Sequence, residues 1–190
     1  MPRASARTSN RIVIYELRIT IVGIKPAVWR QVLVPSVASL EYLHVVIQEC
    51  FGWQDYHLYR FDVLGRAFES PESDSGVGDA RSAALSSLNL KVGSKFRYTY
   101  DFGDDWQHEV QLVGTHAVGD EMFYPACIGG ARAGPLEDSS GSYGYMELIN
   151  ILADPTHPEY AERLEWSGPD FQPDVFDIRA TNRILQLVFV

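Results

Sequence analysis

Nine consecutive residues, from Tyr100 to His108, carry the densest group of chemically capable side chains in the chain. The stretch reads Tyr-Asp-Phe-Gly-Asp-Asp-Trp-Gln-His and sets three carboxylates, those of Asp101, Asp104 and Asp105, beside a histidine. Carboxylates are the ligands that Mg²⁺ and Mn²⁺ prefer, and a nearby histidine could serve as a general base. Gly-Asp-Asp is also common in hairpin turns. The stretch therefore predicts a metal or catalytic site, a structural turn, or an acidic surface for a partner.

A second polar stretch is the glycine-rich run from Pro125 to Tyr145, which holds five glycines and two prolines. Loops longer than about 12 to 15 residues are usually functional or disordered. Because this run leads into an aromatic helical pattern, we expect a functional loop. Glu137 or Asp138 could complete a metal shell begun by the aspartates of the first stretch. Arg132 could bind a carboxylate or phosphate, or pair with Glu137 or Asp138 and hold the loop in shape.

Three histidines lie near aromatic residues in the sequence. His44 falls on the apolar side of a helical pattern, so it is either a buried neutral histidine with one hydrogen-bond partner or part of a pocket with His57 and His108. Sequence spacing leaves both interpretations open. Four aromatic residues, Trp53, Tyr100, Phe102 and Trp106, are expected in the core, with a stacking platform for bases as the alternative.

The two cysteines, Cys50 and Cys127, lack a Cys-x-x-Cys partner, so the sequence predicts neither a disulfide framework nor a structural zinc site. Cys50 falls in an apolar helical pattern and is expected to be a buried thiol. Cys127, near the start of the glycine-rich run, is either another buried thiol or a ligand or nucleophile. No cofactor is predicted. A divalent metal ion is the possible exception, because the carboxylates could hold one.

The elements that must position these side chains follow from the apolar pattern. Alternation predicts strands from Ile12 to Ile24 and from Val28 to Val34, and Tyr56 to Leu64 predicts a third. Ser39 is the expected N-cap of a helix that ends at Gly52.

Two further strands, from Phe96 to Phe102 and from Trp106 to Val113, predict a hairpin with a three-residue turn. This turn pairs Tyr100 with His108 and places the large apolar residues on one face. Because burial selects such a register, we expect His108 on the aromatic face and Asp101 on the opposite face.

The C-terminal third is predicted to be helical, over residues 143–152 and again from Pro173 onward, whereas residues 69–87 predict a loop. Strands come first and helices last. We therefore expect one α+β domain over residues 12–190, with an antiparallel sheet, a long helix after the second strand and a helical C-terminal third. Residues 1–11 are expected to form a disordered basic tail.

The charge balance bears on the partners. The chain has 16 basic and 25 acidic residues, a net charge of −9, and three of its arginines lie in residues 1–11. The rest of the chain is therefore more acidic still and would repel a phosphate backbone. Nucleic-acid binding by the folded part is not expected, and DNA binding through the arginine tail is the remaining option. No apolar run could span a bilayer and no signal peptide opens the chain, so we expect a cytoplasmic protein without membrane contacts.

Several sequence blocks together resemble one known family. Residues 43–53 read Leu-His-x-x-Ile-Gln-x-x-Phe-Gly-Trp, and residues 100–108 form the second block described above. Residues 125–138 read Pro-x-Cys-x-Gly-Gly-x-Arg-x-x-Pro-x-Glu-Asp, and residues 171–176 read Phe-x-Pro-x-x-Phe. In this order, over residues 12–190, the blocks resemble the plasmid pRiA4b ORF-3-like family.

The resemblance implies an α+β fold and occurrence in bacteria and archaea, often on plasmids and beside insertion elements, but no established activity. Some members carry a resolvase label, which gains no support here because the chain is acidic and shows no serine-recombinase block. Members commonly read Glu-Asp-Cys-Gly-Gly where this chain has Glu-Asp-Ser-Ser-Gly at residues 137–141. Ser139 removes half of any cysteine pair in relatives, which argues against a cysteine-based mechanism.

The leading hypothesis is a non-enzymatic module, carried by mobile elements or host genomes, that binds a protein or small molecule. Its candidate binding residues are Tyr100, Asp101, Asp104, Asp105, Trp106, Arg132 and Asp138. The alternative is a metal-dependent hydrolase or nuclease-like enzyme. Its candidate metal ligands are Asp101, Asp104 and Glu137, and its catalytic candidates are His44, His108 and Glu137. Convergence of these side chains on one point would favour the enzyme.

Overall fold

The computed structural model describes residues 12–73, 75–119 and 122–189, and an eight-stranded sheet forms its centre. The strands are β1 (Val13–Ile21), β2 (Trp29–Pro35), β3 (Tyr59–Val63), β4 (Arg66–Glu69), β5 (Gly78–Asp79), β6 (Lys95–Tyr100), β7 (Trp106–Ala117) and β8 (Ala126–Ala131). Their order in the sheet is β5-β4-β3-β6-β7-β1-β2-β8, and each neighbouring pair except β4–β5 is antiparallel. The expected basic tail lies outside the described residues.

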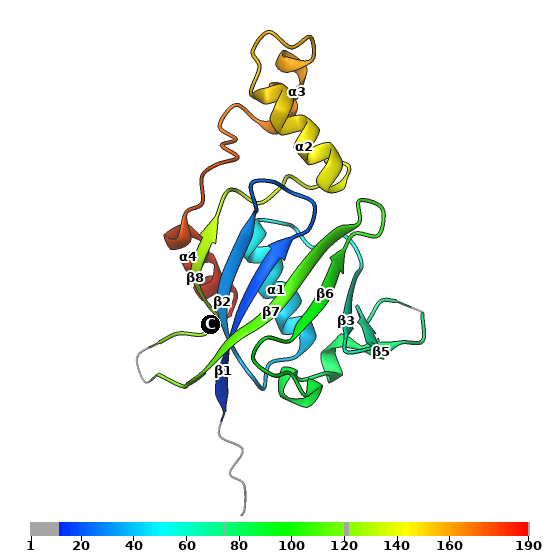
Figure 1. Ribbon diagram of the computed structural model, residues 1–190, viewed down its shortest axis with the longest axis vertical. Coiled ribbons are helices and arrows are strands. Elements are labelled where there is room, and N and C mark those ends of the chain that lie inside the picture. The colour runs from blue at the N-terminus through cyan, green and yellow to red at the C-terminus, as the bar shows by residue number, and fades with distance from the viewer. Residues whose placement is uncertain (1–11, 74, 120–121, 190) are drawn as a thin grey trace, which may run out of the picture.

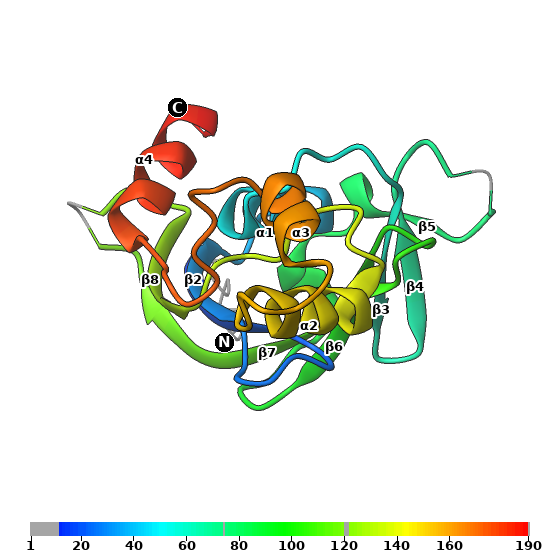
Figure 2. The same cartoon turned by 90° about the horizontal axis from the view of Figure 1, so that it is seen from above.

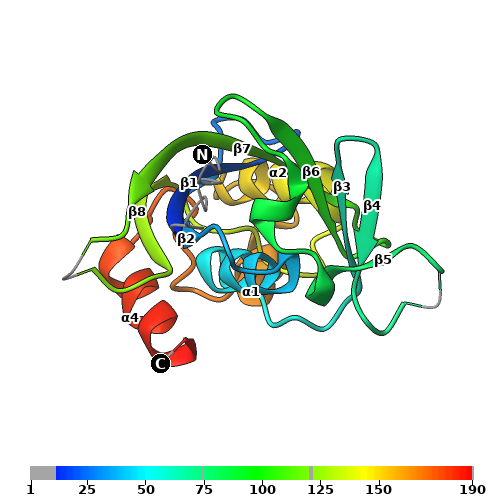
Figure 3. The ribbon, with the colours of Figure 1, turned by 90° about the horizontal axis from the view of Figure 1, so that it is seen from below.

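Helix α1 (Leu40–Phe51) lies inside the curve of the sheet, as the view from below shows (Figure 3). Both of its predicted ends are confirmed. The Ser39 hydroxyl accepts a hydrogen bond from the backbone N–H of Tyr42 at 3.0 Å, and Gly52 ends the helix with a left-handed φ of 79°. Glycine adopts this conformation without steric cost, so the turn into the next segment begins here.

Alternation along the first two strands gives the sheet one apolar face and one solvated face. The side chains of Leu17 and Ile19 in β1 and of Val32 in β2 are fully buried on the face that holds α1. Both strands are therefore confirmed, and Arg30 shares the same buried face.

The Arg30 side chain is only 2% exposed and links four segments. Its Nε donates to the carbonyl of Cys50 at the end of α1 at 2.8 Å, and Nη1 donates to the carbonyls of Trp29 at 2.8 Å and Ala131 at 3.1 Å. The guanidinium also lies 3.9 Å from the ring centre of Phe176. Burial lowers the pKa of Arg30 to about 10, so the group remains charged at neutral pH.

The β6–β7 hairpin has a longer turn than predicted. Tyr100 pairs with Trp106, so the expected Tyr100–His108 pairing is wrong by two residues. Asp101 lies in the turn with a left-handed φ of 54°, and its carbonyl accepts from the N–H of Asp105 at 2.7 Å. Because a shift of two residues keeps each side chain on its face, His108 still lies on the aromatic face, as predicted.

Three helices follow the sheet and confirm the helical C-terminal third: α2 (Gly141–Leu152), α3 (Tyr160–Ser167) and α4 (Ile178–Val188). Helices α2 and α3 lie together beyond one end of the sheet, and α4 packs beside β8 and α1 (Figures 1 and 2). The last helix begins later than Pro173, because the Asp177 carboxylate caps it by accepting from the N–H groups of Arg179 and Ala180 at 2.8 and 3.0 Å.

Two predicted loops contain more structure than expected. The glycine-rich run begins as edge strand β8 and ends in α2, which leaves residues 132–140 as the connecting loop. Residues 69–87 include β5 and two short 3₁₀ turns that bury Ala80 and Leu85 in the core. Within the described ranges, no helix has the length and apolar character needed to cross a membrane.

Candidate functional site

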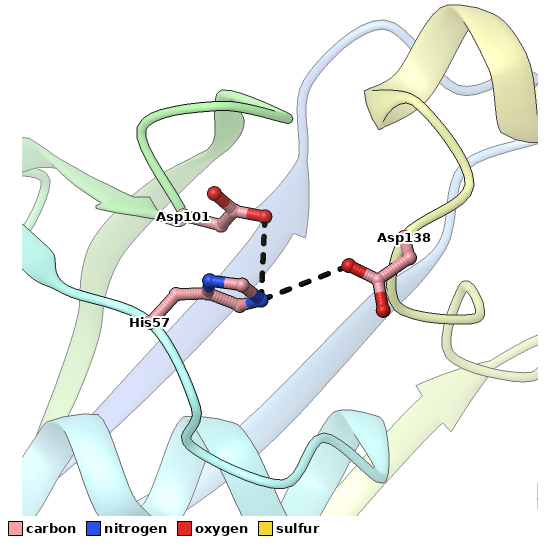
Figure 4. Close-up of side chains that lie close together, drawn as sticks. All are labelled: His57, Asp101 and Asp138. Carbon is pink, nitrogen blue, oxygen red and sulfur yellow. Dashed lines mark ion pairs between the residues drawn. The ribbon is translucent and has the colours of Figure 1, made fainter.

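Three side chains from separate segments meet near the tip of the β6–β7 hairpin. His57 comes from the loop between α1 and β3, Asp101 from the hairpin turn, and Asp138 from the loop before α2 (Figure 4). The Nε2 atom of His57 lies 3.7 Å from Asp101 Oδ2 and 3.7 Å from Asp138 Oδ1. All three ligand atoms lie within 4.8 Å of one another, and no second such group occurs in the described part of the chain. We call this group the His57 cluster.

Two backbone hydrogen bonds of the hairpin turn position the Asp101 carboxylate. The N–H of Asp101 donates to the carbonyl of Leu58 at 3.0 Å, which ties the turn to the residue after His57. Its Oδ1 accepts from the N–H of Gly103 at 2.9 Å. Aspartate tolerates the left-handed conformation of such turns. The turn therefore occupies Oδ1 and leaves Oδ2 facing the imidazole.

Glu137 positions the loop that carries Asp138. The Tyr100 hydroxyl donates to Glu137 Oε1 at 2.7 Å, and the N–H of Gln54 donates to Glu137 Oε2 at 2.9 Å. Burial raises the pKa of Tyr100, and its hydrogen bond to Glu137 adds to the effect, so the phenol keeps its proton. Both oxygens of Glu137 are thus engaged, and this sequence-predicted metal ligand is not a member of the cluster.

The remaining hairpin candidates do not join the cluster either. The Asp105 carboxylate accepts from the side-chain amide of Gln107 at 2.7 Å. Asp104 is not within the group defined above, and its backbone carbonyl oxygen occupies the space that a Cβ on Gly141 would need. Trp106 is 1% exposed and belongs to the core, as predicted, whereas the prediction for Phe102 is wrong, because this residue lies in the hairpin turn and is 50% exposed.

Arg132 forms an ion pair with Asp174 instead of with Glu137 or Asp138. It therefore connects the loop before α2 to the segment before α4. The Asn182 side-chain amide connects α4 to β8. It accepts a hydrogen bond from the N–H of Cys127 and donates one to the carbonyl of Cys127, both at 2.8 Å. Cys127 is a buried free thiol, as is Cys50, and neither belongs to the His57 cluster.

His44 is buried and bonded at both ring nitrogens. Its Nδ1 lies 2.7 Å from the Tyr98 hydroxyl, and its Nε2 lies 2.8 Å from Asp55 Oδ1. The Gln48 amide donates to that same hydroxyl at 2.9 Å, so the Tyr98 hydroxyl links Gln48 to His44. The interpretation as a buried histidine is supported, with two partners instead of one.

His108 is also buried, with no exposed surface. Its Nδ1 donates to the carbonyl of Trp106 at 3.0 Å, and the rings of Phe51 and Trp53 each lie 5.3 Å away. Burial lowers the pKa of His108 to about 3. A neutral imidazole enclosed in this way does not reach a substrate in solvent.

Acidification is expected to destabilise the protein through His108. The unfolded histidine has an ordinary pKa of about 6.5, whereas the folded one has a pKa of about 3. The unfolded chain therefore takes up a proton first, and this part of the stability is lost as the pH falls from about 6.5 toward 3. Between pH 7 and pH 5 the loss is about 2 kcal/mol. Urea unfolding at both pH values should show this loss of unfolding free energy in the wild type and not in His108→Gln. Equal losses in the two proteins would contradict the attribution to His108.

The sequence does not mark His57 as a metal ligand. It suggests a pocket with the other histidines, but nothing in its spacing relates it to Asp101 or Asp138. The available signal was its place just after α1, in a loop that must return toward the hairpin.

Comparisons with known proteins identify the relatives of this chain. Residues 13–180 match the family described as plasmid pRiA4b ORF-3-like protein. The uncharacterized protein y4hQ of Sinorhizobium fredii is 40% identical over 159 residues, which cover 82% of this chain and 81% of that protein. The crystal structure of MM3350, a protein of unknown function from Methanosarcina mazei Go1, matches with a TM-score of 0.82 and 35% identity, covering 88% of this chain and 97% of that one. The resemblance seen in the sequence blocks is confirmed, and the chain belongs to the plasmid pRiA4b ORF-3-like family.

Proposed function

We propose that this protein is a binding module whose ligand is a divalent metal ion held by His57 Nε2, Asp101 Oδ2 and Asp138 Oδ1. The observation that carries the proposal is the 3.7 Å separation of the imidazole nitrogen from each carboxylate. In a tetrahedral site with bonds of about 2.0 to 2.2 Å, neighbouring ligand atoms lie about 3.3 to 3.6 Å apart. Movements of a few tenths of an ångström would therefore bring the imidazole nitrogen to the required separation from each carboxylate. The ligand oxygens of the two carboxylates lie within 4.8 Å of each other.

The ligand types favour Zn²⁺ or Mn²⁺. Imidazole nitrogen suits transition metals, whereas Mg²⁺ and Ca²⁺ prefer shells made of oxygen alone. Two carboxylates also supply a formal charge that balances a divalent ion. The hydrogen bond between Tyr100 and Glu137 supports the site, because it fixes the backbone next to Asp138.

A second candidate function is metal-dependent hydrolysis at the same ion. The side chains of Asp138 and His57 are 78% and 35% exposed, and three protein ligands leave a coordination position for water, as in catalytic zinc sites. Asp101 remains from the ligand set proposed on sequence grounds, while His57 and Asp138 replace Asp104 and Glu137. Carriage by mobile elements and a protein partner stay predictions.

Metal titration of the stripped full-length chain tests the site. A ligand that binds only the folded state, present at 100 times its dissociation constant, stabilises by about 2.7 kcal/mol, so Zn²⁺ or Mn²⁺ should raise Tm visibly. Asp101→Asn should abolish the rise, because it removes a charged ligand while asparagine still accepts the left-handed turn. The matched control is Asp105→Asn, which changes a second left-handed aspartate of the same hairpin and should bind like the wild type.

The outcomes separate the candidates. No shift with any of Zn²⁺, Mn²⁺, Mg²⁺ and Ca²⁺, or an undiminished shift in Asp101→Asn, would refute the site. Turnover of a chromogenic phosphodiester by the metal-loaded protein, lost in Asp101→Asn, would establish the hydrolase. Binding without turnover would support the binding module.

A further inference from the structure

A cavity of about 380 Å³ opens beside α1, and His57 is the one proposed metal ligand among its lining residues. The first half of α1 forms one side, the loop between α1 and β3 the second, and the segment that follows β4 the third. The volume falls in the range of small-molecule sites. The cavity is therefore large enough for a ligand of several carbon atoms.

The cavity wall is negatively charged. Glu41, Asp55 and Glu72 contribute carboxylates, and the described lining contains no lysine or arginine. Arg81 is the nearby cation, and it is exposed and already paired with the Asp79 carboxylate at 2.9 Å. A field of this sign attracts cations and repels anions.

Two buried hydroxyl groups in the wall lack partners. Tyr59 and Ser70 are 4% and 5% exposed, and neither the Tyr59 hydroxyl nor Ser70 Oγ has a hydrogen-bond partner within the described residues. Buried polar atoms are nearly always bonded, so both hydroxyls have an unused bond for an occupant, and an ammonium group would reach them with a small movement of the wall, because both oxygens are buried in this structure. Burial raises the pKa of Tyr59, and Glu41, Asp55 and Glu72 add to the effect, so the phenol stays neutral beside its acidic neighbours.

The arrangement of the carboxylates selects the type of cation. A metal ion needs its ligand atoms within a few ångströms of one another, and within the described ranges the His57 cluster is the group that meets this condition. Glu41, Asp55 and Glu72 belong to different segments around the rim. Carboxylates spread in this way fit several ammonium groups on a flexible chain, while Val45 and Tyr56 provide apolar surface for its methylene groups.

We infer that this cavity binds a linear aliphatic polyamine, with ammonium groups bonded to the three carboxylates and to the hydroxyls of Tyr59 and Ser70. Asp55 Oδ1 accepts from His44, which leaves its Oδ2 for the ligand. An ammonium group carries three donors and no acceptor, which matches a wall composed mainly of acceptors. The cavity shares His57 with the proposed metal site, and spermidine is expected to bind without any metal ion present.

Calorimetric titration of metal-stripped full-length protein with spermidine, with butylamine as the single-charge comparison, tests this inference. The buffer should hold about 0.15 M salt, which screens diffuse attraction to an acidic surface. We expect saturable binding of spermidine, at least about tenfold tighter than that of butylamine, since one charge-assisted hydrogen bond changes affinity by about that factor.

Variants locate the binding. Tyr59→Phe removes the hydroxyl and keeps the ring that stacks on His44 at 3.7 Å, and Glu72→Gln removes one carboxylate; each should weaken spermidine binding about tenfold. Glu165→Gln, which changes an exposed acid on α3, should bind like the wild type. No saturable binding, unchanged affinity in Tyr59→Phe and Glu72→Gln, or an equal loss in Glu165→Gln would overturn the inference.

Discussion

Replacing Gly141 with alanine is expected to destabilise the protein by about 3 kcal/mol and to weaken metal binding at the His57 cluster. Gly141 has a left-handed φ of 67°, which costs about 1 to 2 kcal/mol for a residue with a Cβ. An added Cβ would also overlap the backbone carbonyl oxygen of Asp104. Backbone cannot rotate away as a flexible side chain can, so we expect a further overpacking cost of about 1 to 3 kcal/mol.

The effect on the site follows from which segments the contact joins. Asp104 belongs to the same turn as Asp101, and Gly141 begins the helix that follows Asp138. A Cβ at this point would push the hairpin turn away from the loop and separate two of the three metal ligands. Urea unfolding combined with Zn²⁺ titration measures both consequences.

Gly65→Ala is the matched control. Gly65 also has a left-handed φ, 80°, but open space surrounds the position of its missing Cβ. This variant should show the conformational cost of about 1 to 2 kcal/mol alone and keep wild-type metal affinity. Equal effects of the two substitutions would contradict the close approach at Gly141.

Arg30→Met is the second substitution with a large expected effect, a loss of about 3 kcal/mol in the free energy of unfolding. Methionine keeps an unbranched apolar stem in the core, but it cannot donate to the carbonyls of Cys50, Trp29 and Ala131. A buried acceptor left without its donor costs about 1 to 3 kcal/mol. The Cys50 carbonyl also lies at the end of α1, where a cation is favourable to the helix dipole.

The comparison for Arg30 is Arg97→Met, an exposed arginine on β6, which should change the stability by no more than about 0.5 kcal/mol. Chemical denaturation of both variants at pH 7 measures the difference. If Arg30→Met unfolds at the same denaturant concentration as Arg97→Met, the buried hydrogen bonds contribute little, and the packing of the methionine would account for the stability.

Local signals determined much of the fold. Strands β1 and β2 follow from the alternation of residues such as Leu17 and Val32, and α1 follows from its cap at Ser39 and its stop at Gly52. These signals act between neighbours in the chain, so the sequence carries them directly. The hairpin shows the limit: its buried face was predictable, but its register was not, because Asp101 leaves the strand for a left-handed turn held by its own hydrogen bonds.

The sequence by itself determined that reactive side chains lie in the hairpin and in the glycine-rich run. The tertiary structure alone decided which of them meet. On sequence grounds Glu137 is the metal-ligand candidate and Asp138 only an alternative, but in the fold Glu137 is bonded to Tyr100 and Gln54. His57 lies beside Asp101 because the Asp101 N–H donates to the carbonyl of Leu58. Side chains far apart in the chain converge through the docking of loops against α1, and that docking depends on packing contacts that no local pattern encodes.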